Sequence, residues 1–234
     1  SPSYQWQVNG FNAGTNSATY TSSSLTNNDV VTCIMTSNLG GCVTGNPATS
    51  NGITMSVTVS AAASVSITAS PSGPICSGDN VTFTATAANG GSSPTYQWAL
   101  NGGNVGTNSA TYSSSSLVNG DAVICILTSN AACATGSPAS SNAITMTVTP
   151  TVAASVSVSA NPNPACAGDN VTFTAVATNG GSTPAYQWQV NGSNVGTNSA
   201  TYSSSSLTTG SAVKCIMTSS ATCATGSPAT SNTV

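Results

Sequence analysis

Short runs of alternating apolar and polar residues occur along the whole chain. The two clearest runs carry an apolar residue at every second position: Val81, Phe83, Ala85 and Ala87 in one, and Val123, Cys125 and Leu127 in the other. A period of two is typical of a β-strand with one buried face. Gly, Pro, Asn and Asp, which favour turns, separate the runs. The pattern therefore predicts an all-β protein, and nothing in it indicates a helix.

One stretch of sequence occurs three times. YQWQVNGFNAGTNSATYTSSSL begins at Tyr4 and returns almost unchanged at Tyr96 and at Tyr186, so the copies begin 92 and 90 residues apart. A period of this length suits one small all-β domain. We therefore expect three tandem repeats, cut from a longer array. They are residues 1–60 (partial, without the first strands), residues 61–150, and residues 151–234 (with an incomplete final strand).

The second repeat carries the signals of an immunoglobulin-like β-sandwich. Its best-defined strands are predicted at 64–69, 81–87, 95–100, 110–113, 122–128 and 143–149. Asn101-Gly102 predicts a tight hairpin turn. Cys125 stands where immunoglobulin domains place their second cysteine, but Phe83 occupies the position expected for its partner. The usual bridge between the two sheets therefore cannot form.

Aromatic residues recur at equivalent positions and are predicted to lie in the core of each repeat. They are Trp6, Trp98 and Trp188, together with Tyr4, Tyr96 and Tyr186. A tryptophan on the third long strand of a sandwich is typical of a core residue. The alternative is a carbohydrate-binding module, in which aromatic and Asn side chains line a shallow groove and bind surface glycans. That alternative requires exposed tryptophans.

Charged residues are almost absent. The chain has one Lys, four Asp, and no Glu, Arg or His. A nucleic-acid backbone is bound through several Lys or Arg, so a nucleic-acid partner is excluded. No apolar run reaches the roughly 20 residues of a membrane span, so direct membrane insertion is not expected. No acid and base are paired, and Lys214 is a lone charge at a position held by Thr32 and Ile124 in the other copies. We therefore expect no enzymatic activity, no catalytic residue and no cofactor.

Eight cysteines in a chain of small β domains favour an oxidising, extracellular setting. Three pairs lie close in sequence and flank a short turn: Cys33 with Cys42, Cys125 with Cys133, and Cys215 with Cys223. These pairs, 9, 8 and 8 residues apart, are candidates for disulfides across a bent hairpin.

A second pairing scheme stays open. The turn cysteine, Cys76 or Cys166, can pair with Cys133 or Cys223, which leaves Cys125 and Cys215 as buried thiols. Each complete repeat has three cysteines, so one remains over unless neighbouring repeats or separate chains are cross-linked. A metal site is disfavoured, because the chain has no His and no C-x-x-C pair.

Aspartates precede two strands of the second repeat. Asp79 and Asp121 are expected at the same end of the domain, where a shared calcium ion is conceivable. Calcium prefers several carboxylates, and Ser211 replaces the second Asp in the third repeat. The aspartates are therefore expected to cap turns.

The motifs of the second repeat also resemble those of a known family. IC-SGDNVTFTA, GGSSPTYQWALNGGNVGTNSATYSSSSL and NGDAVICILTSNAACATGSPASSNAITMTV are similar to the tandem Ig-like or PKD-like repeats of giant cell-surface adhesins of Bacteroidota. That family includes gliding-motility adhesins exported by the type IX secretion system. The resemblance implies an extracellular filament or stalk at the cell surface, and it carries no catalytic residues.

The expected function is structural. The chain is expected to be the repeat region of an extracellular adhesin or filament, a disulfide-supported rod or spacer. Few charged residues protect the edge strands, which favours self-association into a filament or with neighbouring repeats.

Overall fold

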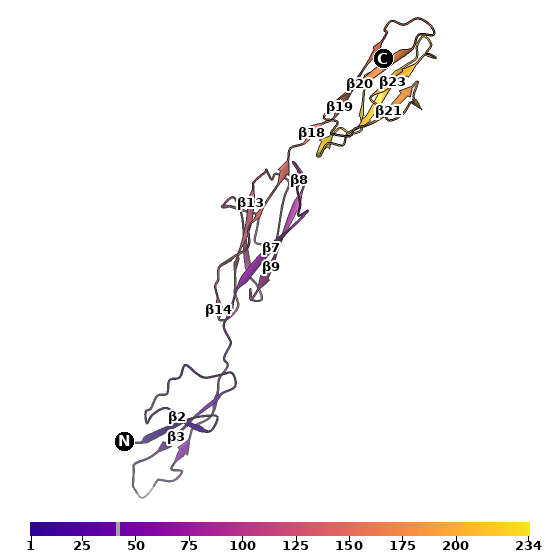
Figure 1. Ribbon diagram of the computed structural model, residues 1–234. Coiled ribbons are helices and arrows are strands. Elements are labelled where there is room, and N and C mark those ends of the chain that lie inside the picture. Colours follow the sequence, from indigo (N-terminus) through magenta and orange to yellow (C-terminus); the bar gives the residue numbers. More distant parts are fainter. Residues whose placement is uncertain (41–42) are drawn as a thin grey trace. The chain divides into compact units, whose positions relative to one another are not determined.

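A computed structural model describes residues 1–40 and 43–234 of the chain (Figure 1). All regular elements in these residues are β-strands. They form two compact units: Ser1–Ser64, Ala88–Pro94 and Thr128–Pro138 in the first, and Val65–Ala87, Thr95–Leu127 and Ala139–Val234 in the second. The division into repeats at residues 60 and 150 stays a prediction, and we keep the three repeats as names for those sequence ranges.

The first unit is built on one antiparallel sheet. Its strands are β1 (Ser3–Val8), β2 (Phe11–Ala13), β3 (Val30–Thr36), β4 (Ala48–Thr49) and β5 (Ile53–Thr54), in the order β2-β1-β3-β4 with β5 also on β3. The same unit contains a parallel pair, β6 (Ala61–Ala62) with β14 (Ala134–Thr135). Among the described residues of the first repeat only Val31 is buried, since no second sheet covers this one there.

The second unit contains two sheets from the second repeat. One has the order β12-β9-β7 and consists of β7 (Ser64–Ser70), β9 (Val81–Ala88) and β12 (Thr111–Ser114). The other, of order β11-β10-β13-β15, consists of β10 (Thr95–Leu100), β11 (Gly103–Val105), β13 (Ala122–Thr128) and β15 (Ala139–Ser140), with β16 (Ile144–Thr145) also on β13. A parallel pair, β8 (Ile75–Cys76) with β17 (Val148–Thr149), completes the repeat.

The third repeat has the same plan. One sheet has the order β19-β20-β23 and consists of β19 (Ser155–Asn161), β20 (Val171–Thr178) and β23 (Thr201–Ser204). The other, of order β22-β21-β24-β26, consists of β21 (Ala185–Val190), β22 (Ser193–Val195), β24 (Val213–Thr218) and β26 (Ala229–Thr230). A parallel pair joins β18 (Val152–Ala153) to β25 (Ala224–Thr225).

The core of the second repeat lies between its two sheets. Alternate side chains of β9 and β13 are buried there: Val81, Phe83 and Ala85 from one sheet, and Val123, Cys125 and Leu127 from the other. The core of the third repeat contains their counterparts. The alternation of the sequence is thus confirmed, and the fold is an immunoglobulin-like β-sandwich in tandem.

The predicted Asn-Gly hairpin is also confirmed. Asn101 and Gly102 have φ of 51° and 82°, so both residues adopt the left-handed conformation. Leu100 then pairs with Gly103 across a two-residue loop. Asn and Gly are the residues that reach this conformation at the lowest cost, which is why the pair specifies the turn.

The last strand of the second repeat differs from the prediction of one strand at 143–149. Ile144 pairs antiparallel with Val123 on β13, whereas Val148 pairs parallel with Ile75 on β8. The segment therefore changes its pairing partner in the middle. Met146, between the two pairs, is buried in the core.

Candidate functional site

One disulfide joins two repeats. Cys76 and Cys223 are bonded with their Cα atoms 5.4 Å apart, although 147 residues separate them in sequence. Cys76 ends β8, which β17 holds in place through the pair Thr149↔Cys76. Cys223 directly precedes β25, and its carbonyl accepts a hydrogen bond of 3.1 Å from the N–H of Val152. The bond therefore connects the two short parallel pairs on either side of the link at Pro150 and Thr151.

The predicted hairpin bridges are not the ones that form. Cys223 bonds to Cys76, so the predicted bridge from Cys215 to Cys223 is wrong, and Cys125 and Cys133 are separate thiols. The remaining candidate, Cys33 with Cys42, lies outside the described residues because of Cys42. The observed bond does use a turn cysteine and a loop cysteine, as in the second scheme, but it joins neighbouring repeats.

The orientation of the strand cysteines explains this outcome. Cys125 and Cys215 are fully buried, because their side chains point from the middle of β13 and β24 into the core. Burial raises the pKa of each thiol from 9.0 to about 11. These thiols pack as small apolar groups and are poor nucleophiles at neutral pH. Cys33, their counterpart in the first repeat, is half-buried.

Two further thiols are exposed. Cys133 occupies the same position in the second repeat as Cys223 in the third, and both have a φ of 60°. Cys166 occupies the same position in the third repeat as Cys76 in the second. Each exposed thiol therefore corresponds to one half of the disulfide that the structure contains.

The core aromatics have different exposures in the three repeats. Trp98 and Trp188 are fully buried, and their indole N–H groups donate hydrogen bonds to the carbonyls of Ser109 (2.9 Å) and Ser199 (2.8 Å). Buried in this way, neither can stack on a sugar. Trp6 and the three tyrosines of the same strands, Tyr4, Tyr96 and Tyr186, are half-buried.

Trp6 is half-buried because the described residues of the first repeat form one sheet. Its counterpart Trp98 packs against Phe83 of the opposite sheet, with ring centroids 6.3 Å apart. The described part of the first repeat has no counterpart of Phe83. A cavity of about 430 Å³ lies there instead, lined by Trp6, Tyr20, Thr21, Ser22, Leu25, Val31, Ile53 and Met55.

The aspartates cap turns. Asp79 Oδ2 accepts a hydrogen bond of 2.8 Å from the N–H of Cys76, and Asp121 Oδ2 accepts one of 2.8 Å from Val118. In the third repeat Ser211 Oγ takes the same place and accepts the N–H of Thr208 at 3.0 Å. Because a serine accepts the same backbone hydrogen bond in this position, the common role is turn capping.

In the first repeat, the hydrogen bonds that the turn-capping Asp29 accepts also change its pKa. Its carboxylate accepts hydrogen bonds from the backbone N–H of Thr26 and from the Asn9 side chain, both at 2.7 Å. These bonds, that from Thr26 above all, lower the pKa of Asp29. Throughout residues 1–40 and 43–234 there is no group of three or more His, Cys, Asp or Glu that could hold a metal ion.

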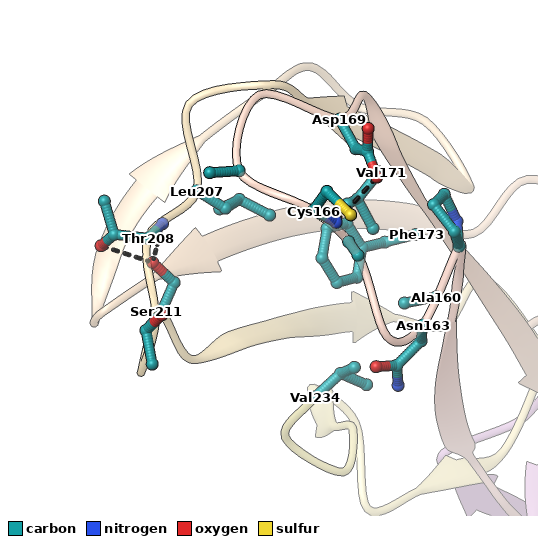
Figure 2. Close-up of a pocket in the computed structure, with 14 residues that line it drawn as sticks. Ala160, Asn163, Cys166, Asp169, Val171, Phe173, Leu207, Thr208, Ser211 and Val234 are labelled. Carbon is teal, nitrogen blue, oxygen red and sulfur yellow. Dashed lines mark hydrogen bonds between the residues drawn. The ribbon is translucent and has the colours of Figure 1, made fainter.

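An open groove lies at one end of the third repeat, and sequence reasoning did not predict it (Figure 2). Its volume is about 460 Å³, and Ala160, Val171, Phe173, Leu207 and Val234 form its apolar lining. Cys166 and Asp169 lie at its edge on the loop between β19 and β20 (Figure 2).

In the second repeat, Met146 and Val148 pack against the counterparts of this apolar lining. Both are buried in its core, and Leu117 beside them is 3% exposed. Leu207, the counterpart of Leu117, is only half-buried.

The sequence matches no protein family profile, and no curated protein matches it significantly. Solved structures with similar folds include Ig domains and fibronectin(III)-like modules. The N-terminal eight Ig domains of Down syndrome cell adhesion molecule match 92% of this chain with 13% identity and a TM-score of 0.41, and the match covers 35% of their length. The human OSCAR ligand-binding domain matches 73% of this chain and 97% of its own, with 14% identity and a TM-score of 0.28.

A third structure contains the fibronectin(III)-like modules of Clostridium thermocellum CbhA. It matches 72% of this chain and 90% of its own, with 14% identity and a TM-score of 0.32.

The strand order and paired cores described above define the class on their own: a chain of tandem immunoglobulin-like domains. Across the described residues, no helix is long and apolar enough to cross a membrane.

Proposed function

We propose that this chain is a structural repeat region of an extracellular adhesin or filament, and that it acts as a disulfide-supported rod. The observation that carries the proposal is the bond between Cys76 and Cys223, which joins one repeat to the next. Disulfides persist in oxidising, extracellular environments, which favours a location at the cell surface.

The bond changes how the chain would carry a pulling force. A force applied at the two ends follows the shortest covalent path, which passes from Cys76 through the two sulfur atoms to Cys223. Residues 77–222 lie outside this path. The core strands β9, β13, β20 and β24 therefore bear no tension from the ends while the disulfide is intact. Such a chain resists extension through a covalent bond as well as through its sheets.

The surface supports the same role. Two per cent of the residues are charged, so that attraction between surface charges contributes little and changes of salt or pH have few groups to act on. The buried tryptophans of the second and third repeats remove the main support for the carbohydrate-binding alternative. The resemblance to Bacteroidota adhesin repeats supports the finer proposal of a surface adhesin exported by the type IX system, with ligand binding left to other regions.

Single-molecule force spectroscopy tests the mechanical role. With handles at the two ends, the oxidised chain should reach a final extended length about 500 Å shorter than the reduced chain, because roughly 3.5 Å is withheld for each of the 147 residue steps that the bond spans.

The double variant Cys76→Ser/Cys223→Ser is the control. It should reach the full length with or without reductant. An oxidised wild-type chain that also reaches the full length would contradict the proposal.

A further inference from the structure

Three hairpin turns of the chain share one dipeptide and one backbone conformation. The pairs are Asn9-Gly10, Asn101-Gly102 and Asn191-Gly192. The asparagines have φ of 51°, 51° and 50°, and the glycines after them have φ of 83°, 82° and 83°. All three asparagines are exposed. An asparagine before glycine deamidates readily, because glycine has no side chain to shield its backbone nitrogen from the asparagine amide. The local chemistry of the three turns is therefore the same.

The amide oxygen of each asparagine is also held in the same way. It accepts a hydrogen bond of 2.9 Å from a backbone N–H near the start of the facing strand, and the donors are Val30, Ala122 and Ala212 in the three repeats. A donor on this oxygen draws electrons from the amide carbon and favours attack on it. Because the bond is common to all three turns, it does not make one of them more reactive than another.

The amide nitrogen is held by a carboxylate in the first two repeats. Asn9 Nδ2 donates to Asp29 Oδ1 and Asn101 Nδ2 donates to Asp121 Oδ1, both at 2.7 Å. Asp121 is buried, whereas Asp29 is only half-buried. The bond therefore forms whether or not the turn is closely packed.

The third repeat lacks this carboxylate. Ser211 stands in its place, and the Ser211 hydroxyl accepts the backbone N–H of Thr208 at 3.0 Å. Within the described residues, the Nδ2 of Asn191 has no hydrogen-bond acceptor, so its amide is held at the oxygen alone. The three turns thus differ in one contact, which follows from the residue at position 211.

From this comparison we infer that Asn191 is a site of spontaneous deamidation, and that Asp29 and Asp121 protect Asn9 and Asn101 from the same reaction. The inference concerns a covalent modification of the chain and goes beyond the proposed structural function.

The reaction needs only water as a co-reactant. The backbone nitrogen of Gly192 attacks Cγ of Asn191, so that an N–Cγ bond forms and the Cγ–Nδ2 bond breaks. The amide group leaves as ammonia with the N–H proton of Gly192. Water then opens the cyclic imide at one of its two carbonyl groups, and the ammonia takes up the proton of the new carboxyl group. The product is aspartate or isoaspartate, and it adds one negative charge to a chain of formal net charge −3.

The carboxylate slows this reaction because it fixes the side chain. Cγ reaches the backbone nitrogen only after the side chain rotates out of its place in the hairpin. At Asn101 the rotation breaks hydrogen bonds at both ends of the amide, one of them to a charged group. At Asn191 it breaks one neutral bond. Hydrogen bonds to charged groups are the stronger kind, so the reactive conformation is rarer at Asn101.

The aspartate product is also better tolerated in the third repeat. At position 101 it would place a second carboxylate against Asp121, where a hydrogen bond of 2.7 Å now lies. At position 191 no carboxylate stands opposite, and the oxygen that accepts the N–H of Ala212 is retained. Repulsion therefore opposes the product in the second repeat only.

Incubation of the full chain at mildly alkaline pH, followed by peptic digestion and mass spectrometry, measures both sites in one sample. We expect Asn191 to deamidate at least about tenfold faster than Asn101, since one hydrogen bond to a charged group is worth roughly that factor. Equal rates, or faster conversion of Asn101, overturn the inference.

The same measurement in concentrated urea separates the fold from the local sequence. Both side chains lose their partners when the chain unfolds, and both still precede a glycine, so the two rates should converge. If the difference persists in urea, the local sequence is its cause and the inference is wrong.

Three variants test the carboxylate itself. Ser211→Asp should slow the deamidation of Asn191 about tenfold, and Asp121→Ser should accelerate that of Asn101 by a similar factor. Ser211→Ala is the matched control, because it changes the same residue without supplying a carboxylate, and it should not slow Asn191. No slowing by Ser211→Asp, or equal slowing by Ser211→Ala, overturns the inference.

Discussion

Cys76 and Cys223 are bonded although each has another cysteine much nearer in sequence, Cys125 in one case and Cys215 in the other. Cys125 and Cys215 point into the cores of their repeats, whereas Cys76 and Cys223 lie beside the link between the second and third repeats. The disulfide therefore couples repeats and does not reinforce a single one.

Reduction of this bond should destabilise the second and third repeats together. A closed loop of 147 residue steps loses conformational entropy in the unfolded state, and this gives an upper limit of roughly 5 kcal/mol for its contribution. We expect the urea midpoint of the wild-type chain to fall when a reductant is added. The variant Cys76→Ser/Cys223→Ser should unfold at the lower midpoint in both conditions, and a wild-type midpoint that ignores the reductant would contradict the prediction.

Replacement of the buried tryptophans should be far more damaging than replacement of the partly exposed one. Trp98→Ala removes a fully buried ring and leaves the carbonyl of Ser109 without its donor, so we expect a loss of about 3 to 5 kcal/mol. Trp6→Ala is the matched control, because Trp6 makes the same bond to Ser17 but has no opposing sheet. Urea unfolding followed by circular dichroism measures both, and equal losses would show that the second sheet contributes little.

The sequence predicted the strands and the core well for a physical reason. The alternation at Val81 and Phe83, or at Val123 and Leu127, follows from the pleat of a strand with one buried face. The Asn101-Gly102 turn follows from the backbone conformations that these two residues adopt at low cost. Both are local properties that a single sequence displays directly.

The candidate site was harder to predict, because it depends on contacts between distant residues. Spacing alone favoured Cys215 with Cys223, but the alternation that places Cys215 among inward-facing residues already argued against that pair. The partner of Cys223 lies in the neighbouring repeat, beside the link where the two short parallel pairs meet. No local pattern encodes this contact.

Exchanging the residues at positions 121 and 211 should change the stability of the two repeats in opposite directions. Asp121 lies in the turn before β13, and Ser211 lies in the corresponding turn before β24. Asp121 accepts hydrogen bonds from the N–H of Val118 at 2.8 Å and from the Asn101 side chain at 2.7 Å, whereas Ser211 accepts the first kind only. Asp121→Ser should therefore cost about 1 kcal/mol or more, and Ser211→Asp should stabilise the third repeat by a similar amount through Asn191.

Thermal or urea unfolding of the two single variants measures this exchange. Asp121→Ala serves as the reference, since it removes both hydrogen bonds and should be more damaging than Asp121→Ser. If Ser211→Asp is destabilising instead, the second hydrogen bond does not account for the aspartate in this turn.

The buried thiols should make the stability of the chain fall at alkaline pH. Burial raises the pKa of Cys125 and of Cys215 from 9.0 to about 11, so between these values the unfolded chain releases protons that the folded chain retains. Stability that is fully present below pH 9 should therefore decrease as the pH rises toward 11. The variant Cys125→Ala/Cys215→Ala should lose this pH dependence.

Iodoacetamide gives an independent measurement: below pH 9 it should label the exposed Cys133 and Cys166 in the folded chain and leave the two core thiols intact. Labelling of all four at similar rates would mean that the cores open far more readily than their packing indicates.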